Sequence, residues 1–438
     1  MYRIKIFVSY VIPSVLAFAL MGVYTIVDGF FIGNSVGDIG LSTINIVFPV
    51  ASLLQALGTG IGMGGAILYA IAMASGQTEK AKDILRSTIL LLLLVSIAVM
   101  AGLSAFLQQI LRLLGAADAM LTMGTDYLRV IILGAAFQIL GTGVVPLIRN
   151  NNGSAYAMVS MIAGFITNIV LDYLFIWVFG QGMMGAALAT ITGQAITAIL
   201  GIIFLVTKKL PFIGLPKMNF GEIALKITKI GIAPFGLTIS PIISVVFLNR
   251  ASIANGGASA VACYACISYA TSIVYMLLQG VGDGTQPLMS QEYGKNRIGE
   301  LHKYRFYAYV TAFAVGAACM AILFVLRYQT GNIFGASATV TADVAKTIPV
   351  FLCGIPFLAV ARVTSSSLYA TEKSILSYIL VYAEPILMIG LLFVLPAFYG
   401  QDGVWWSMPL AQVMTAGIAV FLKIKADGAC AVQVNLVE

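Results

Sequence analysis

The scarcity of charged residues is the feature that most restricts the fold of this chain. Of 438 residues, 60% are hydrophobic and only 9% are charged, whereas soluble domains average about 25% charged residues. So few polar side chains cannot cover an ordinary water-facing surface, which excludes the soluble enzyme classes. Apolar runs such as Leu90–Val95 do not alternate with polar residues, as the strands of a membrane β-barrel would. The composition therefore predicts an all-α polytopic membrane protein.

Polar breaks divide the chain into apolar segments that each reach or exceed the roughly 20 residues a helix needs to cross a bilayer. The basic segment 208–222 separates six of these segments from another six, which predicts an N-terminal six-helix lobe (1–207), a linker (208–222) and a C-terminal six-helix lobe (223–438). The twelve predicted spans are 7–33, 39–73, 84–111, 120–148, 154–179, 184–207, 223–250, 257–291, 304–327, 338–370, 374–399 and 402–423.

Lysine and arginine are distributed unevenly between the breaks. Only Arg112, Arg250 and Arg327 occur on one side of the predicted membrane, against eighteen basic residues on the side that holds both termini. The positive-inside rule then places both termini and the linker in the cytoplasm. The net charge of +7 is a topology signal, and no nucleic-acid partner is expected.

The two halves repeat one pattern of polar, glycine and proline residues. Because six spans per half is an even number, both halves insert with the same orientation, as in transporters built from parallel repeats. The i,i+3 pairs Asp126/Arg129 and Asp343/Lys346 are expected to be structural ion pairs. The matches are Pro13 with Pro234, Asn34 with Asn255, Gly60–Gly64 with Gly280–Gly284, Asp126/Arg129 with Asp343/Lys346, and Gly182 with Gly400.

Two carboxylates lie inside apolar spans of the N-terminal lobe, Asp28 and Asp172. A charge there costs about 2.5–3.5 kcal/mol, so it usually faces a cavity. Counting about 1.5 Å per residue from the outer ends of their spans places Asp28, Asp172 and Thr190 about 8, 12 and 9 Å deep. Asn168 precedes Asp172 by one turn, on the same face. Such oxygen ligands suit a hard cation, and crowded carboxylates can instead hold a proton; helix bracing is the alternative.

The membrane charges of the C-terminal lobe are Arg362 and Glu384. They either pair with each other or line a substrate cavity, and the sequence leaves both interpretations open. Asn249 stands near the position that corresponds to Asp28. Asp283, near the inner end of its span, is expected to be a solvated or capping group.

The chain offers little to bind a cofactor. Its one histidine, His302, lies in a basic loop, and its five cysteines show no metal-ligand spacing. Cys263 and Cys266 form a CxxC pair inside an apolar helix, where small packing residues are the expected role. We therefore predict no cofactor, no catalytic residues and no enzyme.

Three stretches resemble the multidrug and toxic compound extrusion (MATE) family: TIVDGFFIGNSVG, TNIVLDYLFIWVFGQGMMGAALAT and LLQGVGDGTQPLMSQEYGKNR, which begin at residues 25, 167 and 277. The resemblance covers essentially the whole chain. It implies two parallel six-helix bundles and an inner-membrane antiporter that exports organic, often cationic, compounds in exchange for Na⁺ or H⁺.

Within that family the chain looks like the DinF-type branch, which implies a cation site in the N-terminal lobe. Its side-chain ligands would be Asp28, Asn168, Asp172 and Thr190, and Ala186 would contribute its backbone carbonyl. Tyr173 follows Asp172 where the family often has proline, which leaves the local helix bend open. The acidic C-lobe site of the other branch is not expected, because residues 223–249 contain no Asp or Glu.

These features together predict a cation-coupled antiporter that exports cationic or amphipathic compounds by alternating access. The alternative is a flippase for lipid-linked oligosaccharides or other lipids, which needs a cationic cavity; only Arg362 offers such a charge near the midplane. The expected partners are a small organic substrate and the lipid bilayer, and we expect a monomer.

Overall fold

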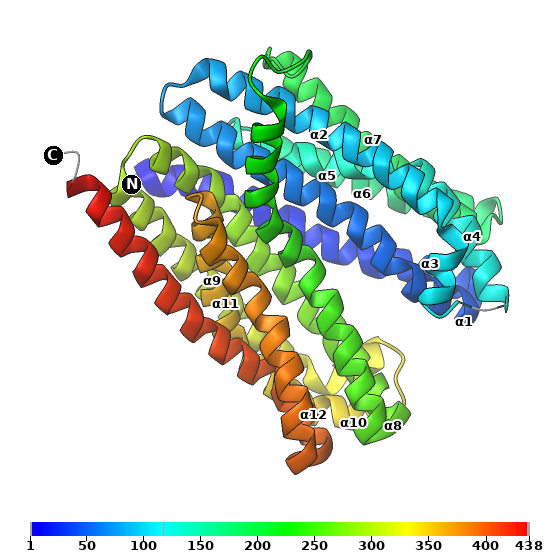
Figure 1. Ribbon diagram of the computed structural model, residues 1–438. Helices are drawn as coiled ribbons and strands as arrows, with labels where there is room; N and C mark the ends of the chain where they lie inside the picture. The colour runs from blue at the N-terminus through cyan, green and yellow to red at the C-terminus, as the bar shows by residue number, and fades with distance from the viewer. Residues whose placement is uncertain (1, 117, 436–438) are drawn as a thin grey trace. The chain divides into compact units, whose positions relative to one another are not determined.

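A computed structural model of the chain describes residues 2–116 and 118–435; the side chain of Cys430 lies outside that description (Figure 1). The described residues form helices and no strand. The first half contains α1 (Tyr2–Ala74), α2 (Thr78–Ala105), α3 (Leu107–Leu113), α4 (Asp118–Leu133), α5 (Ala135–Asn150), α6 (Ser154–Asp172), the π-helix η1 (Tyr173–Val178) and α7 (Gly182–Thr207). The second half contains α8 (Phe220–Gly294), α9 (Ile298–Ile333), α10 (Ala338–Leu352), α11 (Ile355–Ala370) and α12 (Ser374–Asn435).

The helices are long and apolar enough to span a membrane many times. Eight pass by length and hydropathy within the described residues, or ten when each bent helix pair, α4/α5 and α10/α11, counts as one span. The long helices α8 and α12 each contain one non-helical residue, Gly257 and Gly400, at which each divides into two. The described part of the chain therefore has twelve spans, and the predicted all-α fold is confirmed.

The two halves repeat the same backbone at a spacing of 220 residues. Helices α2 and α9 begin at residues 78 and 298, and α6 and α12 begin at residues 154 and 374. The turns repeat as well, because residues with positive φ recur at that spacing. These pairs are Gly37 and Gly257, Gly76 and Asn296, Gly115 and Gly335, Asn152 and Glu372, and Gly180 and Gly400.

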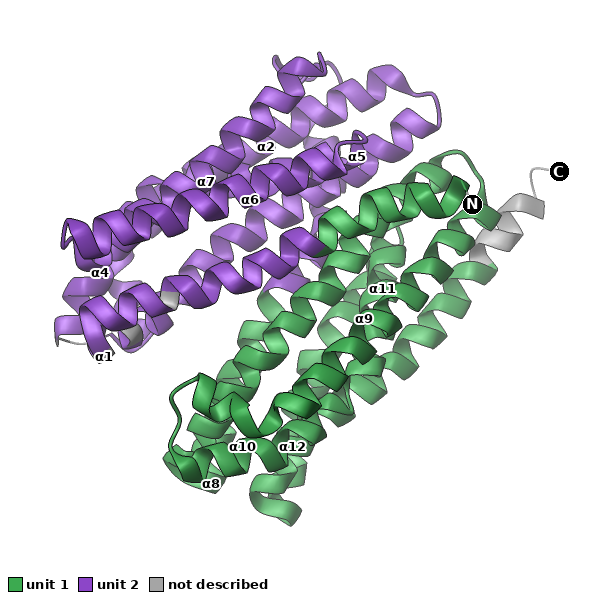
Figure 2. Ribbon diagram, turned by 180° about the vertical axis from the view of Figure 1, so that it is seen from behind, with its two compact units in different colours: residues 1–15, 239–438 green, residues 16–238 purple. Residues whose placement is uncertain are grey.

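Contacts within the chain divide it into two compact units, coloured in Figure 2: unit 1 is residues 1–15 and 239–438, and unit 2 is residues 16–238. The first residues of α1 thus pack with the second half, and those of α8 with the first half. Phe7 and Val11, for example, are buried in the same hydrophobic core as Leu278 and Met289. The sequence-based boundaries at the 208–222 linker stay a prediction about lobes.

The glycine-rich stretches mark close helix crossings inside each unit. In unit 2 a side chain on Gly64 would collide with the backbone of Ile227. In unit 1 a side chain on Gly284 would collide with the backbone of Val11. Both halves therefore use the same glycine position to bring backbones together, since an interior this dense has no room for an added methyl group.

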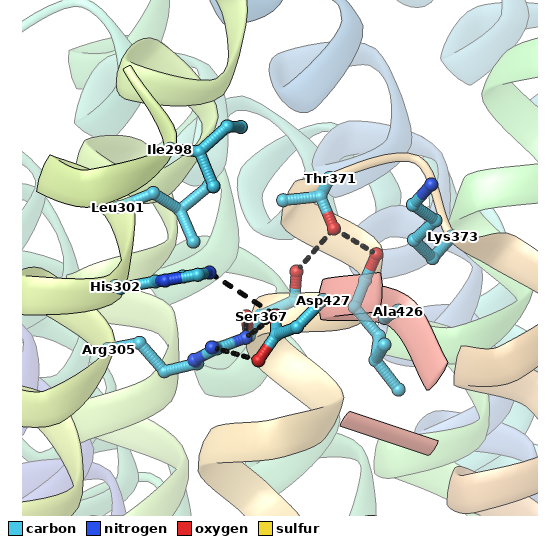
Figure 3. A pocket seen from close by; sticks show the side chains of 10 residues that line it. Ile298, Leu301, His302, Arg305, Ser367, Thr371, Lys373, Ala426 and Asp427 are labelled. Atoms are coloured by element: carbon cyan, nitrogen blue, oxygen red, sulfur yellow. Dashed lines mark hydrogen bonds and ion pairs between the residues drawn. The ribbon is translucent and has the colours of Figure 1, made fainter. Parts of the chain in front are cut away.

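The last turns of α12 are fixed to unit 1 by a charged cluster (Figure 3). Arg305 of α9 donates to both carboxylate oxygens of Asp427, at 2.9 and 2.6 Å, and the Arg305 side chain is 8% exposed. His302 Nε2 lies 3.3 Å from Asp427 Oδ1. His302 was expected in a loop, but α9 begins at Ile298 and includes it. This bidentate pair connects α12 to α9.

The predicted ion pairs Asp126/Arg129 and Asp343/Lys346 are wrong. All four side chains are exposed, and none of them forms an ion pair within the described residues. An exposed pair gains little Coulomb energy and loses side-chain entropy when two long side chains are held in one geometry.

Candidate functional site

Asp28 and Asp172 meet in the core of unit 2. Asp28 lies in the middle of α1, and Asp172 is the last residue of α6 and is fully buried. Their carboxyl groups contact each other in hydrogen-bonding geometry. A hydrogen bond between two carboxyl groups requires a proton on one of them, because two carboxylates in contact repel each other.

Asn168 and Thr190 complete the contact between α6 and α7. With its amide nitrogen turned toward the carboxylate, Asn168 donates to Asp172 Oδ2 at 3.1 Å. In that orientation its oxygen accepts a hydrogen bond from Thr190 N at 3.1 Å. The Thr190 amide is the ordinary helical donor to the carbonyl of Ala186, which lies one turn earlier in α7 and is buried. Its approach to Asn168 leaves the Ala186 carbonyl oxygen open to a second partner.

A π-helix follows Asp172 directly. The widened turns of η1 run from Tyr173 to Val178 and end where Phe179 N donates to Leu174 O at 2.8 Å. Such segments are rare and occur often at functional sites. The sequence left the local bend open because Tyr173 replaces proline. The structure departs from α-helical geometry at this point without proline.

Two tyrosines belong to this cluster, and the sequence did not predict either. Tyr24 and Tyr127 both lie within electrostatic range of Asp28 and Asp172, and the hydroxyl of each approaches Thr190. Tyr24 stacks on Phe165 with ring centroids 5.1 Å apart. Its place one turn before Asp28 was a usable signal, whereas nothing in the sequence around Tyr127 indicated its role.

The resulting cluster has acceptor atoms to spare. Oδ1 of Asp28 and Oδ1 of Asp172 are buried and accept no hydrogen bond. Among the described residues no three His, Cys, Asp or Glu side chains converge, so any ion here has two carboxylates and neutral oxygens as ligands. Carboxylate, amide, hydroxyl and carbonyl oxygens are ligands that hard cations prefer. The same pair of carboxyl groups can hold a proton instead.

Arg362 and Glu384 lie in unit 1 and do not pair with each other. Both are buried, and the guanidinium of Arg362 has no carboxylate partner within the described residues. Glu384 Oε1 instead accepts from Tyr275 Oη at 3.2 Å and from Gln412 Nε2 at 3.3 Å. The ion-pair interpretation of these two residues is therefore wrong, and the substrate-cavity interpretation stays a prediction.

Two smaller predictions for the second half need correction. Asp283 was expected to be solvated, but it is 3% exposed, because Gln279 and Tyr369 of the bundle core donate to it. The turns also refine the repeat, since their spacing of 220 residues aligns Asp28 with Leu248 and not with Asn249.

Comparison with known proteins places this fold and cluster in a family. A family model described as MatE matches residues 13–174 and 230–394. The chain belongs to the MatE family. It is therefore a multi-pass membrane transporter and not an enzyme.

Individual relatives of this MatE chain match along nearly its whole length. The multidrug export protein MepA of Staphylococcus saprophyticus is 25% identical over 419 residues, which cover 94% of this chain and 91% of that protein. MepA of Staphylococcus aureus is 24% identical over 423 residues, covering 95% and 93%. A solved outward-facing multidrug resistance MATE transporter of the MOP superfamily superimposes with a TM-score of 0.91 at 22% identity, covering 98% of this chain and 96% of that one.

Proposed function

We propose that this MatE transporter is an antiporter that exports organic, cationic or amphipathic compounds in exchange for Na⁺ or H⁺. The observation that carries the proposal is the buried contact between Asp28 and Asp172. The family membership and the relatives that are named multidrug export proteins support an export function. The compound itself is described here only by class.

The coupling ion binds at the Asp28–Asp172 pair. A bound Na⁺ takes oxygens from Asp28, Asp172, Asn168 and Thr190, with the carbonyl of Ala186 as a further ligand. A proton instead forms an O–H bond on one carboxyl group and hydrogen-bonds to the other. Either ion neutralises charge that the surrounding apolar helices do not solvate.

Exchange follows from a difference in affinity between conformations. When the ion fills the cluster, the segment of α1 that carries Asp28 is drawn toward α6. Tyr24 moves with that segment and alters its stack on Phe165. Coupling requires only that ion and substrate favour different conformations, so that binding of one weakens binding of the other.

The membrane placement is part of the same proposal. We expect both termini on the cytoplasmic side of the inner cell membrane, because the basic residues concentrate on that side of the predicted topology. A monomer suffices, since Asp28, Asn168, Asp172 and Thr190 all come from one chain. No resident cofactor is proposed. The lipid-flippase alternative is not favoured, because the curated relatives are multidrug export proteins.

The test is export of ethidium from vesicles that contain the full-length protein, driven by an imposed ΔpH or ΔNa⁺. Asp28→Asn and Asp172→Asn should each abolish gradient-driven export while the protein still inserts and folds. Asp126→Asn is the matched control, because Asp126 is an exposed carboxylate of the same unit and should not matter. Full export by both site variants would contradict the proposal.

A further inference from the structure

A chain of polar side chains runs through the core of unit 1, in a different unit from the Asp28 cluster. One end is the carboxylate of Glu384 in α12, which accepts from Tyr275 of α8 and Gln412 of α12. The guanidinium of Arg362 in α11 lies over the ring of Tyr275, 5.4 Å from its centroid. Glu384 Oε2 accepts no hydrogen bond within the described residues.

The other end of the chain is Asp283 of α8. Gln279 Nε2 donates to Asp283 Oδ1 at 2.7 Å, and Tyr369 Oη donates to the same oxygen at 3.2 Å. Arg362 Nη1 approaches Gln279 Oε1 at 3.5 Å. Arg362 therefore stands between two carboxylates, each with its own tyrosine donor, and is within electrostatic range of both tyrosines.

The charges along this chain do not balance. Two carboxylates and one guanidinium leave a net charge of −1 when all three are ionised. The charged groups that act on Tyr275 are Glu384 and Arg362, and those that act on Tyr369 are Asp283 and Arg362. An uncompensated charge in a packed apolar core is costly, and one bound proton restores neutrality.

Two buried polar atoms beside Glu384 lack partners. They are Nε of Arg362, which is 6% exposed, and Oε1 of Gln412, which is 4% exposed. A donor and an acceptor left open in so dense a core cost free energy if the network serves only as a brace. They are explained if Arg362 and Gln412 change partners when a proton arrives or leaves.

We propose that Glu384 is a second proton-binding site of this transporter, in which Asp283 is the ionised partner and Arg362 the movable counter-charge. The proton bonds to an oxygen of Glu384, with Oε2 open to receive it, and Arg362 then neutralises Asp283. When the proton returns to water, Arg362 moves to balance Glu384. No electron is transferred, and no other reactant is needed.

Glu384 holds the proton because its carboxylate is the less stabilised of the two. Its donors lie at 3.2 and 3.3 Å, whereas Asp283 has a donor at 2.7 Å. Tyr275, the donor to Glu384, lies about 12 Å further along α8 than Asp283, at about 1.5 Å per residue. This site is unlike the C-lobe site of the other MATE branch, because residues 223–249 contain no Asp or Glu.

The test is a pH titration of the purified full-length protein in lipid, followed by infrared difference spectroscopy with ¹³C-labelled glutamate. The label separates protonated Glu from protonated Asp, so Asp28 and Asp172 do not interfere. We expect one buried glutamic acid to be protonated near neutral pH. Its band should be lost in Glu384→Gln and should persist in the Asp28→Asn/Asp172→Asn double variant, whatever that variant does to export.

A second variant keeps the proposal testable should Glu384→Gln fold poorly. Asp283→Asn leaves Arg362 and Glu384 as a balanced pair, so the Glu384 proton should be lost although Glu384 is intact. A brace would not respond in this way. Glu79→Gln, whose side chain is 74% exposed, is the control and should leave the band unchanged. A band that survives Glu384→Gln, or a Glu384 that is ionised at every pH, overturns the proposal.

Discussion

The two halves of this transporter have the same backbone but carry their charges in different places. At the spacing of 220 residues, Asp28 corresponds to Leu248, Asp172 to Leu392 and Thr190 to Leu410. In the other direction, Asp283 corresponds to Met63 and Glu384 to Gly164. Each carboxylate therefore has an apolar or glycine counterpart in a fold that is built twice.

The comparison separates what the fold requires from what its function requires. Glycines at crossings and turns recur in both halves, as expected for residues that the backbone needs. Buried carboxylates do not recur, so the helices pack equally well without them at the corresponding position. A bracing role for Asp28 and Asp172 is disfavoured on this ground, and a role in ion binding is favoured.

The largest effect should come from giving one half the residue of the other. Asp172→Leu copies Leu392 and should fold, because leucine is accommodated at the corresponding position of the other half. Gradient-driven ethidium export should fall to that of vesicles without the protein, since the ion loses a ligand and its charge compensation. Export and thermal unfolding of the same preparation check this, and normal export by a folded Asp172→Leu would break the comparison.

Matched glycine substitutions should damage both halves by similar amounts. Gly64→Ala and Gly284→Ala each force a methyl group against a neighbouring backbone, which should lower the free energy of unfolding by about 1–3 kcal/mol or more. Thermal unfolding in one detergent measures both. An effect confined to one variant would show that the two halves do not share this packing.

The turn glycines predict a smaller effect. Gly37 has φ 76° and ψ −161°, and Gly257 has φ 67° and ψ −161°, a region that is essentially restricted to glycine. Alanine at either position should cost about 1–3 kcal/mol by backbone strain alone, because neither site has a neighbour within 4 Å of the added carbon. Equal losses of stability in Gly37→Ala and Gly257→Ala would sharpen the repeat, and unequal ones would weaken it.

The smallest effect should come from removing one neutral ligand. Thr190→Val deletes a hydroxyl from the Asp28 cluster and should weaken binding of the coupling ion by about 1 kcal/mol, a few-fold in affinity. Thr192→Val is the control, because its hydroxyl donates only to the Leu188 carbonyl of its own helix. Ion dependence of ethidium export gives both values, and equal responses would mean that Thr190 is no ligand.

Much of the fold followed from the sequence because hydrophobic length and charge asymmetry are local signals. Twelve spans and two parallel halves could be counted from apolar runs, and the 220-residue register was nearly visible in the glycines. The crossing of the first residues of α1 and α8 into the opposite units was not predictable, because the packing partner of an apolar helix face is not encoded in its own periodicity.

The candidate site was predictable where a charge stood alone among apolar residues. Asp28 and Asp172 were conspicuous for that reason, and depth counting brought Asn168 and Thr190 to their level. Tyr127 and the π-helix at Tyr173 were missed, since an apolar-looking tyrosine and a change of helix type leave no clear mark in composition. Asp283 was misjudged because its donors, Gln279 and Tyr369, become its neighbours only in the folded bundle.

The central claim is that ion and substrate compete through the Asp28–Asp172 pair. The most direct measurement is the dissociation constant of ethidium from the purified protein over a range of Na⁺ concentrations and, separately, of pH. The wild type should bind ethidium more weakly as the coupling ion rises, and the Asp28→Asn/Asp172→Asn double variant should bind it with an affinity that no longer depends on that ion. An ion dependence that is unchanged in the double variant would contradict the account.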